Sequence, residues 1–351
     1  MKPNSIYSQL VTWAAERVFE SCIFSAPMKY IENAAREFDL TPKQNADCGL
    51  EIHHTLPQKI DFAILANPKS LRKTGSDTIE NWNGFNNLLR MPKDSSTITY
   101  DPKCFYEIDF ADKSPMLAGV FYSLKLNRPE SNSKTVLSDL ADGLCVFSNN
   151  YRAIGHSSAV DNLLSLTEPP LHIGRMIGRG DILKLVCRIP PTHLRNIPEI
   201  VPDLFERLPL MLWLKFLQDI QHCFADLFIS VDLNLSEDEL LPQFGLELYF
   251  ARGSERREAI SSFFRVAAGL VPVEDREITE LIMALPYGQK FHSTDLENSV
   301  ASLPKHPPDI VFIADLSHLK VVFSAPSSCF LKSYIRLSAL ALEQRDKPVL
   351  P

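Results

Sequence analysis

The chain has 351 residues, and 45% of them are hydrophobic, which is enough apolar sequence to bury a large core. Its formal net charge of −7 argues against a nucleic-acid partner, because nucleic-acid-binding proteins usually present a basic face. The most apolar stretch, residues 208–217, contains Lys215 and is shorter than the roughly 20 apolar residues of a membrane helix. We therefore expect neither a nucleic-acid partner nor a membrane partner.

The N-terminal residues lack a long apolar core and carry Glu16 and Glu20, so they do not resemble a secretory signal. The seven cysteines form an odd, dispersed set without a Cys-x-x-Cys pair. Such a set is typical of reduced thiols. We expect a cytoplasmic protein in which most cysteines are small core residues.

Two helices are expected near the N-terminus, where residues 6–19 and 28–38 carry apolar side chains at helical spacing. They lie in an N-terminal helical segment, residues 1–40. From Asp47 to Ala341, a pair of strand-like runs followed by a helical run recurs about five times. No shift in composition marks an internal boundary, so we predict a single barrel domain over residues 1–351.

Each expected hairpin consists of two strand-like runs with a polar turn between them. Their strands cover residues 49–56 with 59–65, 105–110 with 118–126, 171–177 with 182–189, 227–233 with 244–250, and 311–323 with 330–337. Helices are expected over residues 79–89, 136–147, 157–166, 198–223, 254–268 and 277–284. The helix over 198–223 should break near Pro202 or Pro209. Residues 127–133 and 286–308 are expected to be irregular, with a polar strand break at Ser317.

Hairpins joined by helices predict an α/β architecture, namely a closed antiparallel barrel of about ten strands with helices outside. Each expected helix is long enough to cross over between hairpins, which takes about ten residues. The alternative is an ordinary α+β protein with two separate sheets. We expect the closed barrel, and we expect function in its interior.

Several strands carry charged or phenolic residues at every second position, and in a closed barrel alternate residues face the interior. Candidates for holding a polyanion such as diphosphate are the cations Lys125, Arg175, Lys184, Arg188, Lys332 and Arg336. Candidates for shielding an allylic cation with their rings are Tyr122, Tyr249 and Tyr334. The alternative is that these residues lie on the solvent faces of half-exposed strands.

Two strand segments echo one another, Gly49-Leu-Glu-Ile52 and Gly245-Leu-Glu-Leu248. If their aliphatic side chains face the helices, Glu51 and Glu247 face the interior. A carboxylate there can take the proton that an acceptor releases after alkylation, and Glu51 is the candidate for this catalytic role. The alternative is a surface glutamate or one half of an ion pair.

Other chemistries have little support in the sequence. The motifs GxxxxGK[ST], GxGxxG, HExxH and GxSxG are absent. His53 and His54 are adjacent on an expected strand, so their rings should point to opposite faces and not share a metal. Asp232 and Asp315 lie on strands of adjacent expected hairpins, where an ion that bridges a diphosphate has two candidate ligands but no supporting motif. The alternative is that they are turn or strand-end aspartates. We expect no tightly bound cofactor, with Mg²⁺ as the candidate accompanying ion.

Consecutive α-β-β-α units that form a ten-strand barrel resemble the ABBA, or PT-barrel, aromatic prenyltransferases. Gly49-Leu-Glu51 looks like the strand that carries the general-base glutamate of that family. Lys184-x-x-x-Arg188 and Lys332-x-Tyr334 look like its positions that hold the allylic diphosphate and shield the cation. The strand over residues 59–65 lacks the arginine commonly found there in the family.

The resemblance implies transfer of an allylic prenyl group from its diphosphate to an aromatic or nucleophilic side chain. Residues 171–176, 245–248 and 318–337 also look similar to uncharacterised bacterial proteins of ribosomal-peptide (RiPP) clusters. That second resemblance implies a precursor-peptide acceptor, as in the cyanobactin prenyltransferases. A small aromatic acceptor, a non-catalytic peptide-binding or accessory protein, and a different enzyme on the same barrel all stay open.

Overall fold

The structure is a computed structural model. It describes residues 6–19, 25–35, 38–40, 46–54, 59–66, 71–73, 94, 98–111, 114–126, 158–179, 182–200, 202, 205, 210–220, 227–235, 240–251, 255–269, 276–291, 310–324 and 328–341. The expected helices over 79–89 and 136–147 and the expected irregular segment 127–133 lie outside these residues. The division of the chain into domains stays a prediction.

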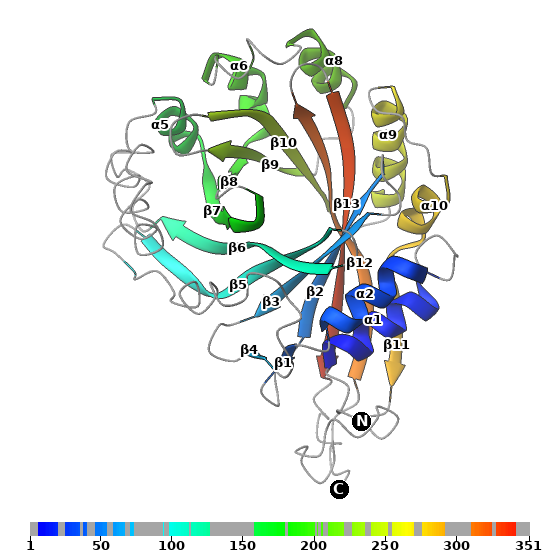
Figure 1. Ribbon diagram of the computed structural model, residues 1–351. Coiled ribbons are helices and arrows are strands. Elements are labelled where there is room, and N and C mark those ends of the chain that lie inside the picture. The colour runs from blue at the N-terminus through cyan, green and yellow to red at the C-terminus, as the bar shows by residue number, and fades with distance from the viewer. Residues whose placement is uncertain are drawn as a thin grey trace, which may run out of the picture.

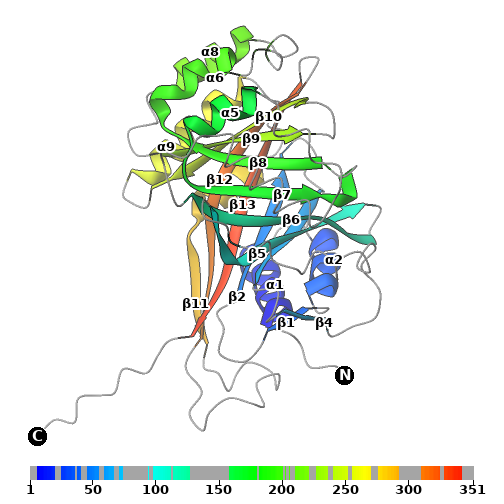
Figure 2. The same ribbon diagram turned by 90° about the vertical axis from the view of Figure 1, so that its left-hand side faces the viewer.

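Antiparallel strands form a closed barrel, and every barrel strand pairs with two neighbours (Figure 1, Figure 2). In chain order the strands are β2 (Ala46–His53), β3 (Ile60–Ala66), β5 (Ile98–Ala111), β6 (Ser114–Leu126), β7 (Glu168–Met176), β8 (Ile182–Ile189), β9 (Leu227–Leu235), β10 (Leu240–Phe250), β12 (Ile310–Ser324) and β13 (Ser328–Ala341). Pairing of β10 with β12 closes the ring. The predicted fold class is therefore confirmed.

Strand β12 belongs to the barrel along only part of its length. Its second half pairs with β10, whereas its first half pairs with an additional strand, β11 (Tyr287–Phe291). The register against β13 shifts between Leu316 and His318, which is the polar break expected at Ser317. Residues 286–308 were expected to be irregular, and strand β11 shows that this expectation is wrong for residues 287–291. The strand was not predicted because its short sequence has no alternating pattern. Among the described residues it pairs only with β12.

Two short strands, β1 (Phe38–Leu40) and β4 (Leu71–Lys73), pair with each other outside the barrel. Neither strand was expected from the sequence. Each has only three residues, which is too short for a periodic pattern to appear.

Helices lie on the outside of the curved sheet (Figure 1). They are α1 (Ile6–Arg17), α2 (Ser25–Ala35), α5 (Ser158–Ser165), α6 (Ile197–Ile200), α8 (Leu210–Ile220), α9 (Arg256–Ala268) and α10 (Arg276–Ala284), with the 3₁₀ turns η3 (Ile177–Arg179) and η4 (Pro191–Asn196). The expected run over 198–223 contains α6 and α8, and the described residues Pro202 and Phe205 between them are helical too. The residues that would show the expected break near Pro202 or Pro209 lie largely outside the described part of the chain. None of the described helices combines the length and the apolar character that a membrane crossing requires.

The hydrophobic core lies between the barrel and the helices. Trp213 of α8 makes edge-to-face contacts with Phe244 of β10 and Phe323 of β12, at centroid distances of 5.2 and 5.5 Å. Trp13 of α1 contacts Phe312 in the same way at 5.6 Å. Burying one such side chain stabilises the fold by about 1.5–3 kcal/mol. Since the apolar residues of these strands face outward, their alternate residues face the lumen.

Candidate active site in the barrel lumen

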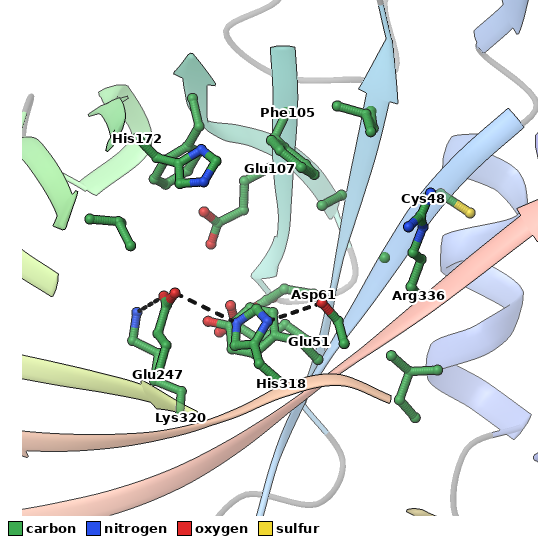
Figure 3. A pocket seen from close by; sticks show the side chains of 18 of the residues that line it. Cys48, Glu51, Asp61, Phe105, Glu107, His172, Glu247, His318, Lys320 and Arg336 are labelled. Carbon is green, nitrogen blue, oxygen red and sulfur yellow. Dashed lines mark hydrogen bonds and ion pairs between the residues drawn. The ribbon is translucent and has the colours of Figure 1, made fainter. Parts of the chain in front are cut away.

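The lumen contains a cavity of about 340 Å³. Its polar lining residues are Asp47, Glu51, Asp61, Glu107, His172, Lys184, Glu247, Tyr249, Ser317, His318, Lys320, Tyr334 and Arg336. Figure 3 shows His318 in the middle of this pocket, with Glu247 and Lys320 on one side and Arg336 on the other. Phe105 and Phe121 line the cavity without filling it. The volume is at the lower end of the range for small-molecule sites.

Three lysines from three different strands converge in the lumen, and we call them the lysine cluster. They are Lys184 of β8, Lys320 of β12 and Lys332 of β13, and the last two lie opposite each other in the β12–β13 register. Burial and the positive charges of the other two lysines lower the pKa of Lys184, against the attraction of Asp232. Such a concentration of buried ammonium groups needs negative partners to persist.

Carboxylates supply those partners. Asp232 contacts both Lys184, at 3.0 Å, and Lys320. Glu247 contacts Lys320 at 3.2 Å. Burial would raise the pKa of Asp232, but the two ammonium groups outweigh it and lower this pKa to about 2. The ionised Asp232 and Glu247 carboxylates therefore lie beside the ammonium groups of the cluster and offset their positive charge.

The first hairpin adds a second charged group. Glu51 contacts Lys332, and the Nε2 atom of His53 lies 3.0 Å from both Glu51 Oε1 and Asp61 Oδ2. Lys59 Nζ lies 3.4 Å from Asp61 Oδ2. Burial opposes the charge on Glu51, but Lys332 and His53 outweigh it and lower the pKa of Glu51 well below its usual range.

Glu51, His53 and Asp61 each present one ligand atom, and these atoms lie within 4.8 Å of one another. A divalent ion would find a plausible ligand set there by geometry. Lys332 and Lys59 already neutralise the two carboxylates, so an ion would add positive charge to a balanced group. We therefore assign no metal ligands, and Mg²⁺ stays a prediction.

One arginine joins two carboxylates on the lumenal face of β5. Arg179, from the η3 turn, donates hydrogen bonds to Glu107 at 2.7 Å and to Asp109 at 2.6 and 2.8 Å. Burial raises the pKa of Glu107, although Arg179 opposes this effect. A bidentate guanidinium–carboxylate contact of this kind fixes both side chains in position.

Two tyrosines enclose a histidine in the lumen. The His318 ring stacks on Tyr334 at a centroid distance of 4.1 Å and lies 4.6 Å from the ring of Tyr249. The Tyr249 hydroxyl donates a hydrogen bond to Glu247 Oε2 at 2.8 Å. Burial lowers the pKa of His318 to about 4. His318 is therefore a neutral imidazole at physiological pH.

The structure brings most of the predicted site residues to the lumen. Those that line the cavity are Glu51, Lys184, Tyr249, Tyr334 and Arg336, and Lys332 reaches it through its contact with Glu51. Arg336 binds Asp47 at 2.8 Å and is half exposed. Arg188 shares the lumenal face of β8 with Lys184 but lies 3.9 Å from Glu168, and it is not among the described residues that line the cavity.

Three predicted residues lie elsewhere, which corrects their assignment. Tyr122 is 1% exposed and points to the outer face, where its ring meets Tyr100 in an edge-to-face contact. Arg175 pairs with Leu183, whereas Gly174 lies opposite Lys184, so Arg175 is on the outer face too. Lys125 is exposed at the end of β6. Tyr122 and Arg175 were assigned to the wrong face of their strands. Side chains alternate between the two faces, so an error of one residue moves a side chain to the other side of the sheet.

The structure also places the two adjacent histidines and the two strand aspartates. His53 faces Glu51 and Asp61, while His54 contacts the Phe264 ring of α9 on the outside, so the predicted opposite faces are confirmed. Asp232 belongs to the lysine cluster. Asp315 instead binds Arg256 of α9 at 2.7 Å, so the two aspartates do not form a common ion site.

Sequence reasoning missed several lumenal residues. They are His53, Asp61, Glu107, His172, Arg179 and His318. A signal existed for some of them, because Glu51-x-His53, Glu107-x-Asp109 and His318-x-Lys320 place two polar residues on one strand face. No such pattern marks Arg179, which lies in a turn.

No protein-family model matches the chain, and no curated protein matches its sequence. Among solved structures, the chain is similar to PriB in binary complex with product diphosphate, at 12% identity and a TM-score of 0.50, over 94% of this chain and 96% of PriB. Prenyltransferase PriB in its apo form gives 13% identity and a TM-score of 0.49 over the same shares. The 5-dimethylallyl tryptophan synthase from Streptomyces coelicolor is 10% identical to this chain, with a TM-score of 0.47, over 99% of each chain. At such identities the likeness to PriB shows the fold alone, the ABBA or PT barrel.

Proposed function

We propose that the chain transfers an allylic prenyl group from its diphosphate to an aromatic or nucleophilic side chain. The observation that carries this proposal is the lysine cluster, which lies in the same cavity as the rings of Tyr249 and Tyr334. Lysine ammonium groups suit phosphate oxygens, and aromatic faces stabilise an adjacent cation. PriB, whose structure with product diphosphate shares this fold at a TM-score of 0.50, binds diphosphate, which is consistent with this assignment.

In the proposed reaction the bond between the allylic carbon and the diphosphate oxygen breaks, and the oxygen keeps the electron pair. The lysine cluster holds the departing diphosphate, while the face of Tyr249 or Tyr334 that points away from His318 shields the allylic cation. The acceptor donates an electron pair to the cation and forms the new bond. The acceptor then loses a proton to Glu51, which is ionised because Lys332 and His53 lower its pKa.

Charge balance favours a companion ion. Asp232, Glu247 and Glu51 already neutralise the lysine cluster, so an incoming diphosphate adds negative charge that the lumen does not match. We therefore propose that Mg²⁺ arrives with the diphosphate rather than occupying a site of its own. Magnesium commonly binds through substrate phosphates and keeps several of its waters.

The acceptor is either a small aromatic molecule or one side chain of a peptide. A cavity of about 340 Å³ holds a prenyl donor and one ring, but not a folded peptide. A non-catalytic peptide-binding role predicted a plugged or shallow lumen. The open and charged cavity does not favour that role.

The test is turnover of dimethylallyl and geranyl diphosphate, with tryptophan, tyrosine and peptides that contain them as acceptors, followed by mass spectrometry. We expect a prenylated product from wild type and at least a tenfold lower rate from Lys184→Met, because one diphosphate ligand is lost. Lys215→Ala, an exposed lysine of α8, is the matched control and should keep the wild-type rate. Equal rates from wild type and folded Lys184→Met, or no product from any pair, would contradict the proposal.

A further inference from the structure

Strand β12 changes the set of residues that it turns toward the helices partway along its length. Trp13 of α1 packs on Phe312 in the first half, and Trp213 of α8 packs on Phe323 in the second half. The buried residues that face outward are Phe312, Ala314 and Leu316 before the register shift, and Leu319, Val321 and Phe323 after it. Even positions therefore face outward first and odd positions afterwards, which requires one extra residue in the strand.

Ser317 is this extra residue. Leu316 and His318 pair with two consecutive residues of β13, so Ser317 forms a β-bulge between them. Without the bulge, strict alternation from Leu316 would turn His318 and Lys320 to the outer face. With it, both line the cavity, as Figure 3 shows.

The bulge lies where β12 exchanges one neighbouring strand for another. Pairing with β11 ends at Ala314, and pairing with β10 begins at Leu319. Neither ladder covers the residues between these two points. The position of a strand is prone to slip where pairing does not specify it, so the bulge needs another contact to fix it.

Arg256, in the first turn of α9, supplies this contact. Its Nη2 donates a hydrogen bond to the Leu316 carbonyl at 2.6 Å, and its Nη1 donates one to Asp315 Oδ1 at 2.7 Å. Leu316 is 3% exposed, so its carbonyl depends on a donor from the protein. The planar guanidinium thus holds two consecutive residues directly before the bulge.

We propose that Arg256 is a positioning residue for the lumenal site, because it fixes the point at which β12 changes face. When the bulge moves by one residue, Ser317 instead of His318 comes to lie opposite Tyr334. Arg256 is not among the residues that line the cavity, so it acts through the strand. The inference rests on the proposed function only for what the placed side chains do, because their placement is a matter of strand geometry.

The stack of His318 on Tyr334, at a centroid distance of 4.1 Å, provides a signal for the test. A tyrosine ring that close shifts the NMR resonances of the histidine ring protons. The measurement uses the full chain labelled with ¹³C-histidine, and His318→Gln identifies the signal by its disappearance.

The test variant carries Arg256→Met together with Asp315→Leu, and we call it the double variant. Replacing both partners of the buried ion pair leaves no single charge behind, while the Leu316 carbonyl still loses its donor. We expect the double variant to lose the shifted His318 signal. Arg257→Met is the matched control, since Arg257 is an exposed neighbour on α9, and it should keep the signal.

Deletion of Ser317 separates positioning of the bulge from general support of the fold. Without Ser317 the strand alternates regularly from Leu316 to His318, so both residues keep their faces and there is no bulge to fix. In this background, the changes at Arg256 and Asp315 should leave the His318 signal in place.

An unchanged His318 signal in the folded double variant, or an equal loss of it with and without Ser317, would overturn the inference. Thermal unfolding shows whether each protein folds. If the double variant folds only after deletion of Ser317, the inference stands; if it folds in neither background, Arg256 supports the whole fold and the inference is wrong. Inorganic diphosphate that fails to raise the Tm of wild type would count against the proposed function alone, because the His318 signal does not depend on it.

Discussion

Glu51 is placed where a base for the proposed reaction has to be. It lies opposite Tyr334 in the β2–β13 register, contacts Lys332 and His53, and lines the cavity. The same contacts that hold its carboxylate in position also keep it ionised. The catalytic role assigned to it from sequence stays a prediction, and the structure supplies the geometry with which to test it.

Replacing Glu51 with Gln removes the site that takes the proton while keeping an oxygen that accepts a hydrogen bond from Lys332. We expect Glu51→Gln to lower the rate of prenyl transfer by about 10²–10⁴, the usual contribution of a general base. Diphosphate binding should stay close to that of wild type, which calorimetry would measure beside single-turnover kinetics. Undiminished turnover would remove Glu51 as the base.

The lowered pKa of Asp232 predicts how the stability of the fold depends on pH. Its pKa of about 2 in the folded state lies below the value of about 3.9 for an unfolded aspartate. Its ionised form therefore stabilises the fold above about pH 4, and this contribution disappears as the pH falls toward 2. We expect Asp232→Asn to lower the free energy of unfolding by about 3–5 kcal/mol at neutral pH, because it leaves two buried lysines poorly paired.

The pH dependence separates this effect from a loss of packing. Urea denaturation measures the free energy of unfolding of wild type and of Asp232→Asn. The difference between these two free energies should be constant above about pH 5 and should become smaller below about pH 4. If the difference in unfolding free energy were the same at every pH, the ionisation of Asp232 would not be its source.

At the level of elements, strand pairing decides which side chains enter the lumen. Gly174 of β7 lies opposite Phe121 of β6, and a Cβ atom on it would lie 2.3 Å from the Phe121 ring. Gly49 of β2 also faces the lumen, but there an added Cβ would have its closest atom at 3.7 Å. The glycine at 174 therefore makes room for the Phe121 ring, whereas the one at 49 does not serve this purpose.

We expect Gly174→Ala to lower the free energy of unfolding by about 1–3 kcal/mol, the usual cost of overpacking. Gly49→Ala is the matched control and should change it by less than about 1 kcal/mol. Chemical denaturation of the two variants measures both effects. A Gly174→Ala variant as stable as Gly49→Ala would show that Phe121 does not need this space.

For many residues, the strand face that the side chain occupies was predictable from the sequence. Alternation placed Glu51, Lys184 and Tyr334 on the lumenal face correctly, because Glu51 and Lys184 lie between outward-facing aliphatic residues and Tyr334 alternates with Lys332 and Arg336. It failed for Tyr122 and Arg175, because both faces of each of these strands carry apolar residues and the sequence pattern does not distinguish the faces. A polar residue on the outer face can be buried under a helix as completely as one in the lumen.

At the level of the whole molecule, the site depends on contacts between distant parts of the chain. Lys332 and Glu51 are separated by 281 positions, and Lys320 and Asp232 by 88. These pairs form only when β10 meets β12 and β13 meets β2, which closes the barrel. The repeat of hairpins predicted the barrel. The carboxylate partner of each lysine could not be predicted, because a local sequence pattern does not determine the register between strands that are distant in the chain.

The proposed function requires the lumen to bind an allylic diphosphate through the lysine cluster. Thermal unfolding with dimethylallyl diphosphate, geranyl diphosphate or inorganic diphosphate, each with and without Mg²⁺, tests it most directly. At about 100 times its dissociation constant a ligand stabilises the folded state by ~2.7 kcal/mol. We predict a clear rise in Tm that is larger for the prenyl compounds than for inorganic diphosphate, larger with Mg²⁺, and lost in Lys184→Met. If Tm does not rise with any of these compounds, the lumen does not bind an allylic diphosphate and the proposed function is wrong.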